Sequence, residues 1–292
     1  MPTRRAFLAS TAAVLVSSNR LFAASSTPAL KSLEPFLKQL EQEKGGRIGV
    51  SVLDTQTGAR AGYRADEAFP MCSTFKLALT AQVLTRVDRG EEKLNRLVTY
   101  TQEEVLSYAP VTKEHVATGM TVGALCEAAI TLSDNTAANL LLVTVGGPAG
   151  FTKWLRSIGD KTTRLDRNEP SLNSGIPGDP RDTTTPSAML VTLQKLTLGN
   201  VLSSASRKQL NDWMLATQTG LKKIKAGLPG DWKEGDKTGA GDHNTTNDIA
   251  VLYPPNRKPV LITVYYTGSK LETEQSNLVF QEIGRKLVSL YV

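Results

Sequence analysis

The chain has 292 residues, of which 40% are hydrophobic and 21% are charged, proportions that are ordinary for globular proteins. A chain of this length buries about three quarters of its unfolded surface, which is enough for one large domain or two modest ones. The formal net charge is +6, and removing residues 1–25, which carry three arginines and no acid, leaves +3. Because this charge is small and no run of like charge forms a binding stripe, the sequence argues against a nucleic-acid partner.

Residues 1–25 are typical of an export signal. Arg4 and Arg5 precede an apolar stretch that ends at Val16, and the small residues 23–25 suit a signal peptidase. The paired arginines favour the twin-arginine route, which exports folded proteins, over an ordinary secretory signal. No apolar run approaches the ~18 residues that a membrane-spanning helix needs. We therefore expect an exported, periplasmic protein without a membrane span.

Strand and helix patterns alternate along the chain in blocks. Residues 33–40 carry hydrophobic side chains at helical spacing, and residues 48–64 read as a β-hairpin around a Gln-Thr-Gly turn. Helical patterns then fill residues 70–215, where Thr121 is a candidate helix cap and a Gly-Gly-Pro run separates two further helices. The segment 73–87 is apolar nearly all round, which is typical of a helix buried inside a domain.

Strand patterns return beyond residue 233, around Lys237 and over residues 249–253 and 259–266, and an amphipathic helix over residues 273–290 closes the chain. Strands at both ends with helices between them predict an α+β fold, in which an antiparallel sheet flanked by the terminal helices carries an inserted all-helical domain. The predicted sheet domain comprises residues 26–68 and 216–292, and the helical domain residues 69–215. Functional sites form preferentially in clefts between such domains.

Four short motifs carry candidate chemistry. On a helix, residues three apart face the same side, so Lys76 can reach the hydroxyl of Ser73. A serine hydroxyl is a weak nucleophile until an adjacent base activates it, and a lysine that has lost its charge in a dry pocket can be that base. The third motif lies in the segment 164–185, a long stretch without periodicity, and loops of this length are uncommon unless functional or disordered. The motifs, in chain order, are Ser73-Thr74-Phe75-Lys76, Ser133-Asp134-Asn135, Glu169-Pro170-Ser171-Leu172-Asn173 and Lys237-Thr238-Gly239.

These motifs in this order are those of the class A serine β-lactamases, which the sequence resembles from about residue 30 to its end. The resemblance implies the family fold and the hydrolysis of the β-lactam ring of penicillins and cephalosporins through a covalent acyl-serine, giving the ring-opened β-amino acid. It also implies that residues 164–185 form the Ω-loop, with an Arg167–Asp182 pair across its neck and a cis peptide before Pro170. The alternative for this segment is a plain surface excursion.

The resemblance also implies the roles of the acylating residues. Ser73 attacks the ring carbonyl, and its backbone N–H and that of Ala240 form the oxyanion hole. Ser133 passes a proton to the departing nitrogen, and Lys76 links the two hydroxyls. Whether Lys76, or Glu169 through a water, first deprotonates Ser73 is left open by the sequence.

Glu169 and Asn173 would hold and activate the water that hydrolyses the ester. Two alternatives share the nucleophile chemistry without this step: a penicillin-binding D,D-peptidase, which lacks the Glu169/Asn173 pair, and a β-lactam sensor, which stays acylated. The substrate-binding residues that the resemblance implies are Asn135 for the acylamide and, around the carboxylate and the site mouth, Lys237, Thr238, Gly239, Tyr108 and Lys223.

For two of these substrate-binding residues, Lys223 and Tyr108, the sequence leaves more than one interpretation. Many relatives have an arginine near the substrate carboxylate, whereas this chain has Thr246 at the strand position and Lys223 at the alternative one. Lysine offers a point charge where arginine offers a bidentate fork, so carboxylate binding is expected to be weaker or rearranged. Tyr108 either lines the site mouth or packs as a loop tyrosine on its own domain.

The chain has only two histidines, His115 and His243, and two cysteines. These are too few to favour a zinc site, which needs three or four ligands, or a catalytic triad built on histidine. We expect no metal, no cofactor and a monomer whose partner is a small-molecule β-lactam.

Relatives with a disulfide pair the Cys72 or Cys126 position with sites that are here Gly241 and Thr80. We therefore expect two free thiols rather than a Cys72–Cys126 bridge.

Overall fold

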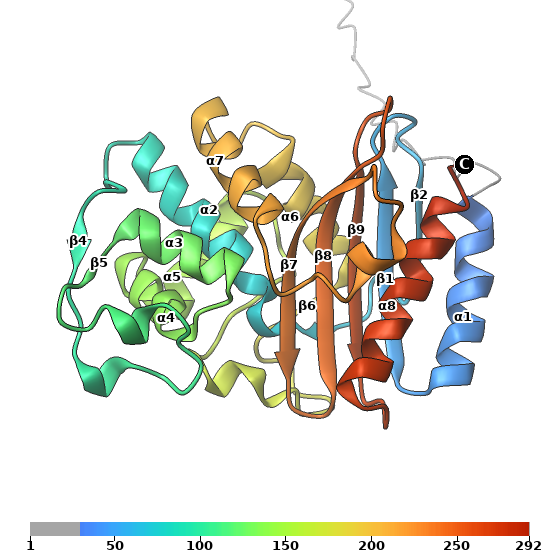
Figure 1. The fold of residues 1–292 in the computed structure, drawn as a ribbon, viewed down its shortest axis with the longest axis horizontal. Helices are drawn as coiled ribbons and strands as arrows, with labels where there is room; N and C mark the ends of the chain where they lie inside the picture. The colour runs from blue at the N-terminus through green and yellow to red at the C-terminus, as the bar shows by residue number, and fades with distance from the viewer. Residues whose placement is uncertain (1–29, 292) are drawn as a thin grey trace, which may run out of the picture.

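The computed structural model describes residues 30–291. Figure 1 shows a β-sheet that is backed on one side by the first and last helices and that faces a group of helices on the other side. The predicted α+β fold, an antiparallel sheet with an all-helical part inserted between its strands, is confirmed. The predicted export signal at residues 1–25 lies outside the described residues.

The main sheet within residues 30–291 has five antiparallel strands in the order β2-β1-β9-β8-β7. Strands from the two ends of the chain therefore pair in the middle of the sheet, where all eight residues of β1 face partners in β9. Because β7 is an edge strand, one side of it is left free to face the helical part. The strands are β1 (Arg47–Asp54), β2 (Arg60–Tyr63), β7 (Lys233–Gly241), β8 (Thr245–Tyr253) and β9 (Val260–Thr267).

Helices α1 (Leu33–Lys44) and α8 (Thr273–Val288) lie side by side on the outer face of the sheet (Figure 1). Each places a hydrophobic stripe on the strands and leaves its polar side in solvent, as amphipathic surface helices do. One hydrophobic cluster fills this layer, with Leu37 of α1 and Phe280 of α8 fully buried against Val264 of β9.

The helical part surrounds α2, whose residues from Phe75 to Thr85 are all buried. This explains why the segment carries apolar side chains nearly all round instead of on one stripe. The prediction that Thr121 caps a helix is confirmed, because its hydroxyl accepts a hydrogen bond from the N–H of Ala124. The helices are α2 (Phe75–Asp88), α3 (Val122–Thr131), α4 (Asn135–Thr144), α5 (Gly147–Ser157), α6 (Pro186–Thr197) and α7 (Ser204–Leu215), and the 3-10 turns are Leu30–Ser32, Cys72–Thr74, Gln102–Glu104, Thr112–Glu114, Ser171–Ser174 and Ile224–Gly227.

Two details differ from the sequence prediction. Residues 70–215 were expected to be free of strands, but β3 (Phe69–Pro70) pairs with β6 (Thr183–Thr184), and β4 (Leu97–Val98) with β5 (Met120–Thr121). A two-residue strand is too short to show the alternation by which strands are recognised. The buried helix also begins at Phe75 and not at Ser73, because a 3-10 turn precedes it.

Candidate active site

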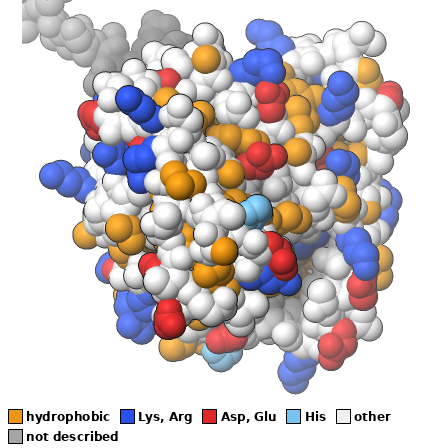
Figure 2. All heavy atoms as spheres, turned by 60° about the vertical axis from the view of Figure 1, so that its left-hand side comes forward, with side chains coloured by type: hydrophobic (Ala, Val, Ile, Leu, Met, Phe, Trp, Pro, Cys, Tyr) orange, Lys and Arg blue, Asp and Glu red, His pale blue; other side chains and the backbone are white. Residues whose placement is uncertain are grey.

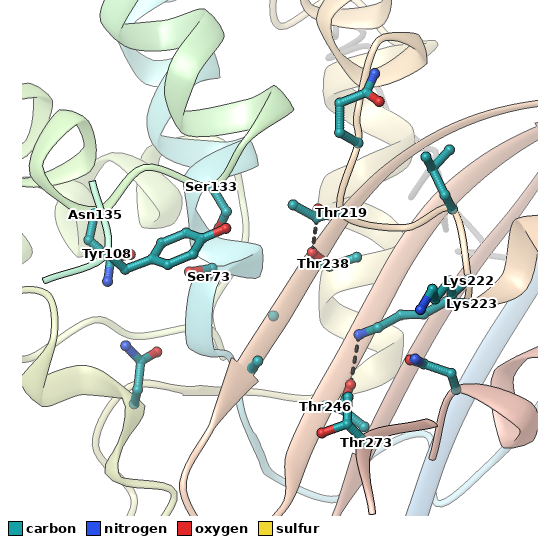
Figure 3. Close-up of a pocket in the computed structure, with 16 residues that line it drawn as sticks. Ser73, Tyr108, Ser133, Asn135, Thr219, Lys222, Lys223, Thr238, Thr246 and Thr273 are labelled. Atoms are coloured by element: carbon teal, nitrogen blue, oxygen red, sulfur yellow. Dashed lines mark hydrogen bonds between the residues drawn. The ribbon is translucent and has the colours of Figure 1, made fainter. Parts of the chain in front are cut away.

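A cleft of about 590 Å³ lies between β7 and the helical part, and residues of all four motifs meet there. Figure 3 shows Ser73, Ser133 and Tyr108 on the helical side of this cleft, facing Thr238 and Lys223 on the sheet side. Lys76, Glu169 and Lys237 are buried and contact the serines that line it. The predicted site residues that line it are Ser73, Tyr108, Ser133, Asn135, Asn173, Lys223, Thr238, Gly239 and Ala240.

The hydroxyl of Ser73 lies between an amine and a carboxylate. Lys76 Nζ donates a hydrogen bond to Ser73 Oγ at 2.8 Å, and Ser73 Oγ donates to Glu169 Oε1 at 3.1 Å. Lys76 and Glu169 also form an ion pair of 3.0 Å whose two side chains are fully buried. Both candidate bases for the nucleophile therefore contact it directly.

Lys76 connects the two serines. Its Nζ also lies within hydrogen-bond distance of the backbone oxygen of Ser133 at 2.8 Å, of Ser133 Oγ at 3.4 Å and of Asn135 Oδ1 at 2.6 Å. Burial lowers the pKa of Lys76 below its usual value, and the neighbouring Glu169 carboxylate opposes this shift. The lowered pKa favours an amine that both accepts and returns a proton.

A second lysine, Lys237 of β7, contacts Ser133 from the sheet side. Lys237 Nζ donates to Ser133 Oγ at 3.0 Å and to the backbone oxygen of Thr238 at 2.9 Å. Burial, and then the positive charge of Lys76, lower the pKa of Lys237 to about 7. Ser133 itself has a left-handed backbone with φ of 58°, and the buried carboxylate of Asp134 caps α4 directly after it.

Glu169 is held in place through both its side chain and its backbone. Asn173 Nδ2 donates to Glu169 Oε2 at 2.5 Å, so the acid and the amide of the third motif are in contact. Asn139 of α4 donates to the backbone oxygen of Glu169 at 2.9 Å and accepts from its N–H at 3.0 Å. The sequence analysis missed Asn139, although it lies four residues after Asn135 and hence on the same side of the helix.

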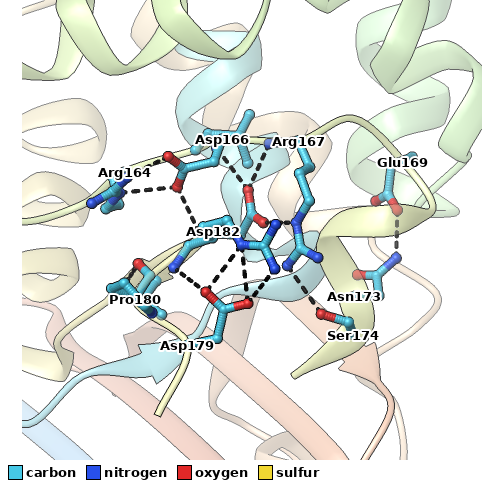
Figure 4. A network of polar contacts seen from close by, with 12 residues as sticks. Arg164, Asp166, Arg167, Glu169, Asn173, Ser174, Asp179, Pro180 and Asp182 are labelled. Atoms are coloured by element: carbon cyan, nitrogen blue, oxygen red, sulfur yellow. Dashed lines mark hydrogen bonds and ion pairs between the residues drawn. The ribbon is translucent and has the colours of Figure 1, made fainter. Parts of the chain in front are cut away.

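The neck of the loop is closed by an ion pair whose acid is buried, which favours a functional loop over a plain surface excursion. Arg167 Nε lies 2.6 Å from Asp182 Oδ2, and the Asp182 side chain is 1% exposed. Asp182 Oδ1 also accepts from the N–H groups of Asp166 at 2.7 Å and Arg167 at 2.9 Å (Figure 4). The predicted pair and the predicted cis Glu169–Pro170 peptide are both confirmed.

Lys223 is the lysine that lines the sheet side of the cleft. Lys223 Nζ donates to Thr246 Oγ1 at 2.7 Å and to the backbone oxygen of Asn247 at 2.9 Å (Figure 3). It also lies 4.9 Å from the ring centroid of Phe280. Thr219, which the sequence analysis did not select, shares a hydrogen bond of 2.6 Å with Thr238. The sequence leaves two alternative positions for a basic side chain near the substrate carboxylate, Thr246 on the strand and Lys223 on the neighbouring segment. Lys223 lies on that segment, and its Nζ reaches Thr246 on the strand.

Tyr108 combines its two predicted alternatives. Its ring is 49% exposed and lines the cleft, while its hydroxyl donates to the backbone oxygen of Leu132 at 3.2 Å. The same tyrosine is therefore anchored on its own part of the protein and available at the site mouth.

The two cysteines are buried and free, as predicted. Burial raises the pKa of both the Cys72 and Cys126 thiols, so each behaves as a small hydrophobic side chain. Among residues 30–291, no group of three or more His, Cys, Asp or Glu side chains is arranged to hold a metal ion. Nor does that part of the chain contain a helix both long and apolar enough to cross a membrane.

The family model of the beta-lactamase enzyme family matches residues 32–291. An ancestral class A β-lactamase of solved structure superimposes with a TM-score of 0.88 at 59% identity, over 89% of this chain and 100% of that one. The chain belongs to the class A β-lactamase family. The putative class A β-lactamase PenP from Rhodopseudomonas palustris has a similar structure, with a TM-score of 0.87 and 52% identity over 88% of this chain and 99% of that one.

Two named enzymes are similar to this class A β-lactamase in sequence. Beta-lactamase L2 of Stenotrophomonas maltophilia is 45% identical over 296 residues, covering 98% of each chain. Beta-lactamase CTX-M-8 of Citrobacter amalonaticus is 48% identical over 238 residues, covering 82% of each. The protein is thus a serine β-lactamase, a hydrolase whose resemblance to the family extends over almost the whole described chain.

Proposed function

We propose that this class A β-lactamase hydrolyses penicillins and cephalosporins through an ester on Ser73, with the motif residues in the roles derived below. The observation that carries the proposal is the position of Glu169, whose buried carboxylate contacts the hydroxyl of Ser73 at 3.1 Å and the amide of Asn173 at 2.5 Å. A water bound to that acid and that amide lies next to any ester formed on Ser73. This arrangement suits hydrolysis of the ester as well as its formation.

Acylation needs one proton to leave Ser73 and one to reach the ring nitrogen. Ser73 Oγ forms a bond to the ring carbonyl carbon, and its proton passes to Lys76 or, directly or through a water, to Glu169. The ring C–N bond then breaks, and the nitrogen takes a proton from the hydroxyl of Ser133. Lys76, which contacts that hydroxyl, returns a proton to Ser133. The contacts of Lys76 with both Ser73 and Ser133 give this transfer a continuous path.

The oxyanion is assigned to the N–H groups of Ser73 and Ala240. Ala240 belongs to an edge strand, in which alternate residues point their N–H and C=O groups away from the sheet. The carbonyls of Asp236 and Thr238 accept hydrogen bonds from the side chains of Thr217 and Lys237, so they face away from β8. By the same alternation, the N–H of Ala240, two residues further on, points toward the cleft.

Deacylation reverses the proton path. Glu169 takes a proton from the bound water, whose oxygen attacks the ester carbon. The C–O bond to Ser73 then breaks, and Ser73 Oγ takes the proton that Glu169 received from the water. General-base assistance of this kind is worth roughly 10²–10⁴-fold in rate.

Substrate recognition is assigned to the two walls of the cleft. Asn135 would hydrogen-bond the acylamide of the drug through its Nδ2, because its Oδ1 already accepts from Lys76. Thr238 and Lys223 line the sheet side of the cleft and would bind the carboxylate (Figure 3). The buried Lys237, which donates to the backbone oxygen of Thr238, would add a second positive charge behind them. Thr219 would orient the hydroxyl of Thr238 through their hydrogen bond.

Sustained turnover separates this function from the two alternatives. Excess nitrocefin mixed with the mature enzyme should be hydrolysed through many cycles at constant rate. A single burst of product equal to the enzyme concentration would instead indicate a sensor. Turnover of a cell-wall D-Ala-D-Ala peptide faster than that of nitrocefin would indicate a D,D-peptidase.

Lys237 makes substrate binding depend on pH. Its pKa of about 7 means that it is protonated below that pH and loses its charge above it in the free enzyme. The KM for benzylpenicillin is therefore expected to rise as the pH is raised through 7, whereas the KM for its methyl ester should stay level. Steady-state kinetics between pH 6 and about 9 measure both, and parallel profiles for acid and ester would contradict the assignment.

We also propose that residues 1–25 direct the enzyme to the periplasm by the twin-arginine route and that it works there as a monomer. The support for the export route is the Arg4-Arg5 pair before an apolar stretch.

On the face seen in Figure 2, basic and acidic side chains are interspersed, which does not suit a polyanionic partner. Normal export after both arginines are replaced by lysine, or a dimer on gel filtration, would contradict these assignments.

A further inference from the structure

Asn247 of β8 connects the sheet to the turn that carries the nucleophile. Its side chain is fully buried, and its Nδ2 donates to the backbone oxygens of Pro70 at 2.9 Å and Met71 at 3.0 Å. These are two of the three residues that precede Ser73. None of the four motifs contains Asn247, and the roles assigned above do not use its side chain.

The turn that Asn247 holds is strained. Cys72, directly before Ser73, has φ of 45°, a left-handed conformation that residues other than glycine rarely adopt. Such a conformation persists only where the surrounding structure fixes it. The oxygen of Met71 accepts from Asn247 and also from the N–H of Thr74 at 3.2 Å and its hydroxyl at 2.8 Å. Asn247 is the partner in this group that comes from the sheet.

The contact passes directly over Gly239, the residue before Ala240. A Cβ on Gly239 would lie 2.8 Å from the oxygen of Met71 and 3.1 Å from Asn247 Nδ2. Gly239 is also the residue opposite Asn247 in the β7–β8 ladder. The third residue of the Lys-Thr-Gly motif is therefore a glycine because the strand and the nucleophile turn approach too closely here for a side chain.

We propose that Asn247 is a positioning residue, which fixes the distance between the N–H of Ser73 on the turn and the N–H of Ala240 on β7. This inference rests on the proposed function, because those two groups are the assigned oxyanion donors. Losing one such donor reduces the rate of other hydrolases by roughly 10²–10³-fold. A loosened pair is expected to reduce acylation by about tenfold to a hundredfold. The KM should change less, because Lys223 contacts Asn247 only through its backbone oxygen.

The substitution Asn247→Asp tests this proposal, because it predicts a pH dependence of the acylation rate that simple destabilisation does not produce. An ionised aspartate has no proton to donate and places a negative oxygen against two carbonyls, whereas a protonated one can donate again. The ratio of variant to parent acylation rates should therefore rise as the pH is lowered from 8 to about 5. Asn247→Leu cannot donate at any pH, so its ratio should stay low throughout.

The titratable side chains beside Asn247 do not produce the same signature. Cys72 lies under the contact, Tyr265 is its ladder partner on β9, and Lys223 donates to its backbone. Burial raises the pKa of the Cys72 thiol and of the Tyr265 phenol and lowers that of Lys223. All three are common to the parent and the variants, so the ratio of rates removes their contribution.

Asn244→Asp is the matched control. Asn244 also donates its amide to a backbone oxygen, that of Ser269 at 2.7 Å, just before β8 begins but away from the nucleophile turn. Single-turnover acylation by nitrocefin is measured for each variant across this pH range, with the melting temperature recorded under the same conditions. We expect a slowed, acid-rescued rate for Asn247→Asp and a parental rate for Asn244→Asp.

The inference would be overturned if Asn247→Asp acylated at the parental rate at pH 8, or if Asn247→Leu showed the same acid rescue. It would also be overturned if the rates of all three variants simply followed their melting temperatures. Failure of the proposed function is a separate result, because it would appear in the parent enzyme as an absence of turnover.

Discussion

Replacing Glu169 with alanine is expected to leave an enzyme that reacts once with benzylpenicillin and then stops. The acid contacts Ser73 and Asn173 and is buried, so the variant loses the base for the hydrolytic water and leaves the nucleophile in place. Deacylation should slow by roughly 10²–10⁴-fold, because that is the usual value of general-base assistance. Stopped-flow absorbance should show a burst of one equivalent, and intact-protein mass spectrometry should show a persistent adduct.

Glu169→Gln is the matched control for this result. The amide keeps the size of the side chain and leaves the two Asn139 contacts to the Glu169 backbone intact, but it cannot act as a base. Both variants should therefore accumulate the adduct, which separates loss of the base from collapse of the loop. Turnover at the parental rate in either variant would show that another group activates the water.

Replacing Ser73 with alanine is expected to abolish covalent chemistry altogether. Removing a nucleophile typically costs several orders of magnitude in turnover, here on the order of 10³-fold or more. The fold should survive, because Lys76 keeps its contacts with Asn135 and Glu169. The two hydrogen bonds that Ser73 loses go to charged groups, and each such bond contributes roughly 1.5–3 kcal/mol to stability. Nitrocefin assays, with melting temperatures as the check on folding, measure both effects.

Ser133→Ala distinguishes the nucleophile from its proton donor. This variant keeps Ser73 and should still form an adduct, only more slowly, because general-acid help is lost while the attacking oxygen remains. If the Ser73→Ala variant formed an adduct as fast as the Ser133→Ala variant, Ser73 would not be the nucleophile.

The motifs were enough to predict which of the proposed catalytic residues lie close together, for a physical reason. Ser73 and Lys76 are three residues apart on one helical segment, and the acid and amide of the third motif are four apart in one turn, so local geometry alone brings each pair together. The order of strands and helices likewise predicted the sheet built from both chain ends. These are features in which short-range spacing or periodicity decides the outcome.

The supporting contacts could not be predicted in this way. Asn139 meets Glu169, Thr219 meets Thr238 and Asn247 meets Met71 across gaps in sequence that only the packed fold closes. Each is a single polar side chain that makes one or two hydrogen bonds to a distant segment, and for Thr219 and Asn247 nothing in the immediate sequence indicates which segment that is. Burial gives these contacts their importance, because an unpaired polar group inside the protein is costly.

The ester on Ser73 is tested most directly by locating the drug on the chain. Glu169→Ala enzyme is incubated with benzylpenicillin, quenched in acid and digested, and the peptides are sequenced by mass spectrometry. The increase of one whole drug molecule should fall on Ser73 and be absent from the Ser73→Ala/Glu169→Ala double variant. An adduct on Ser133 or Lys76, or none in an enzyme that still destroys the drug, would contradict a covalent path through Ser73.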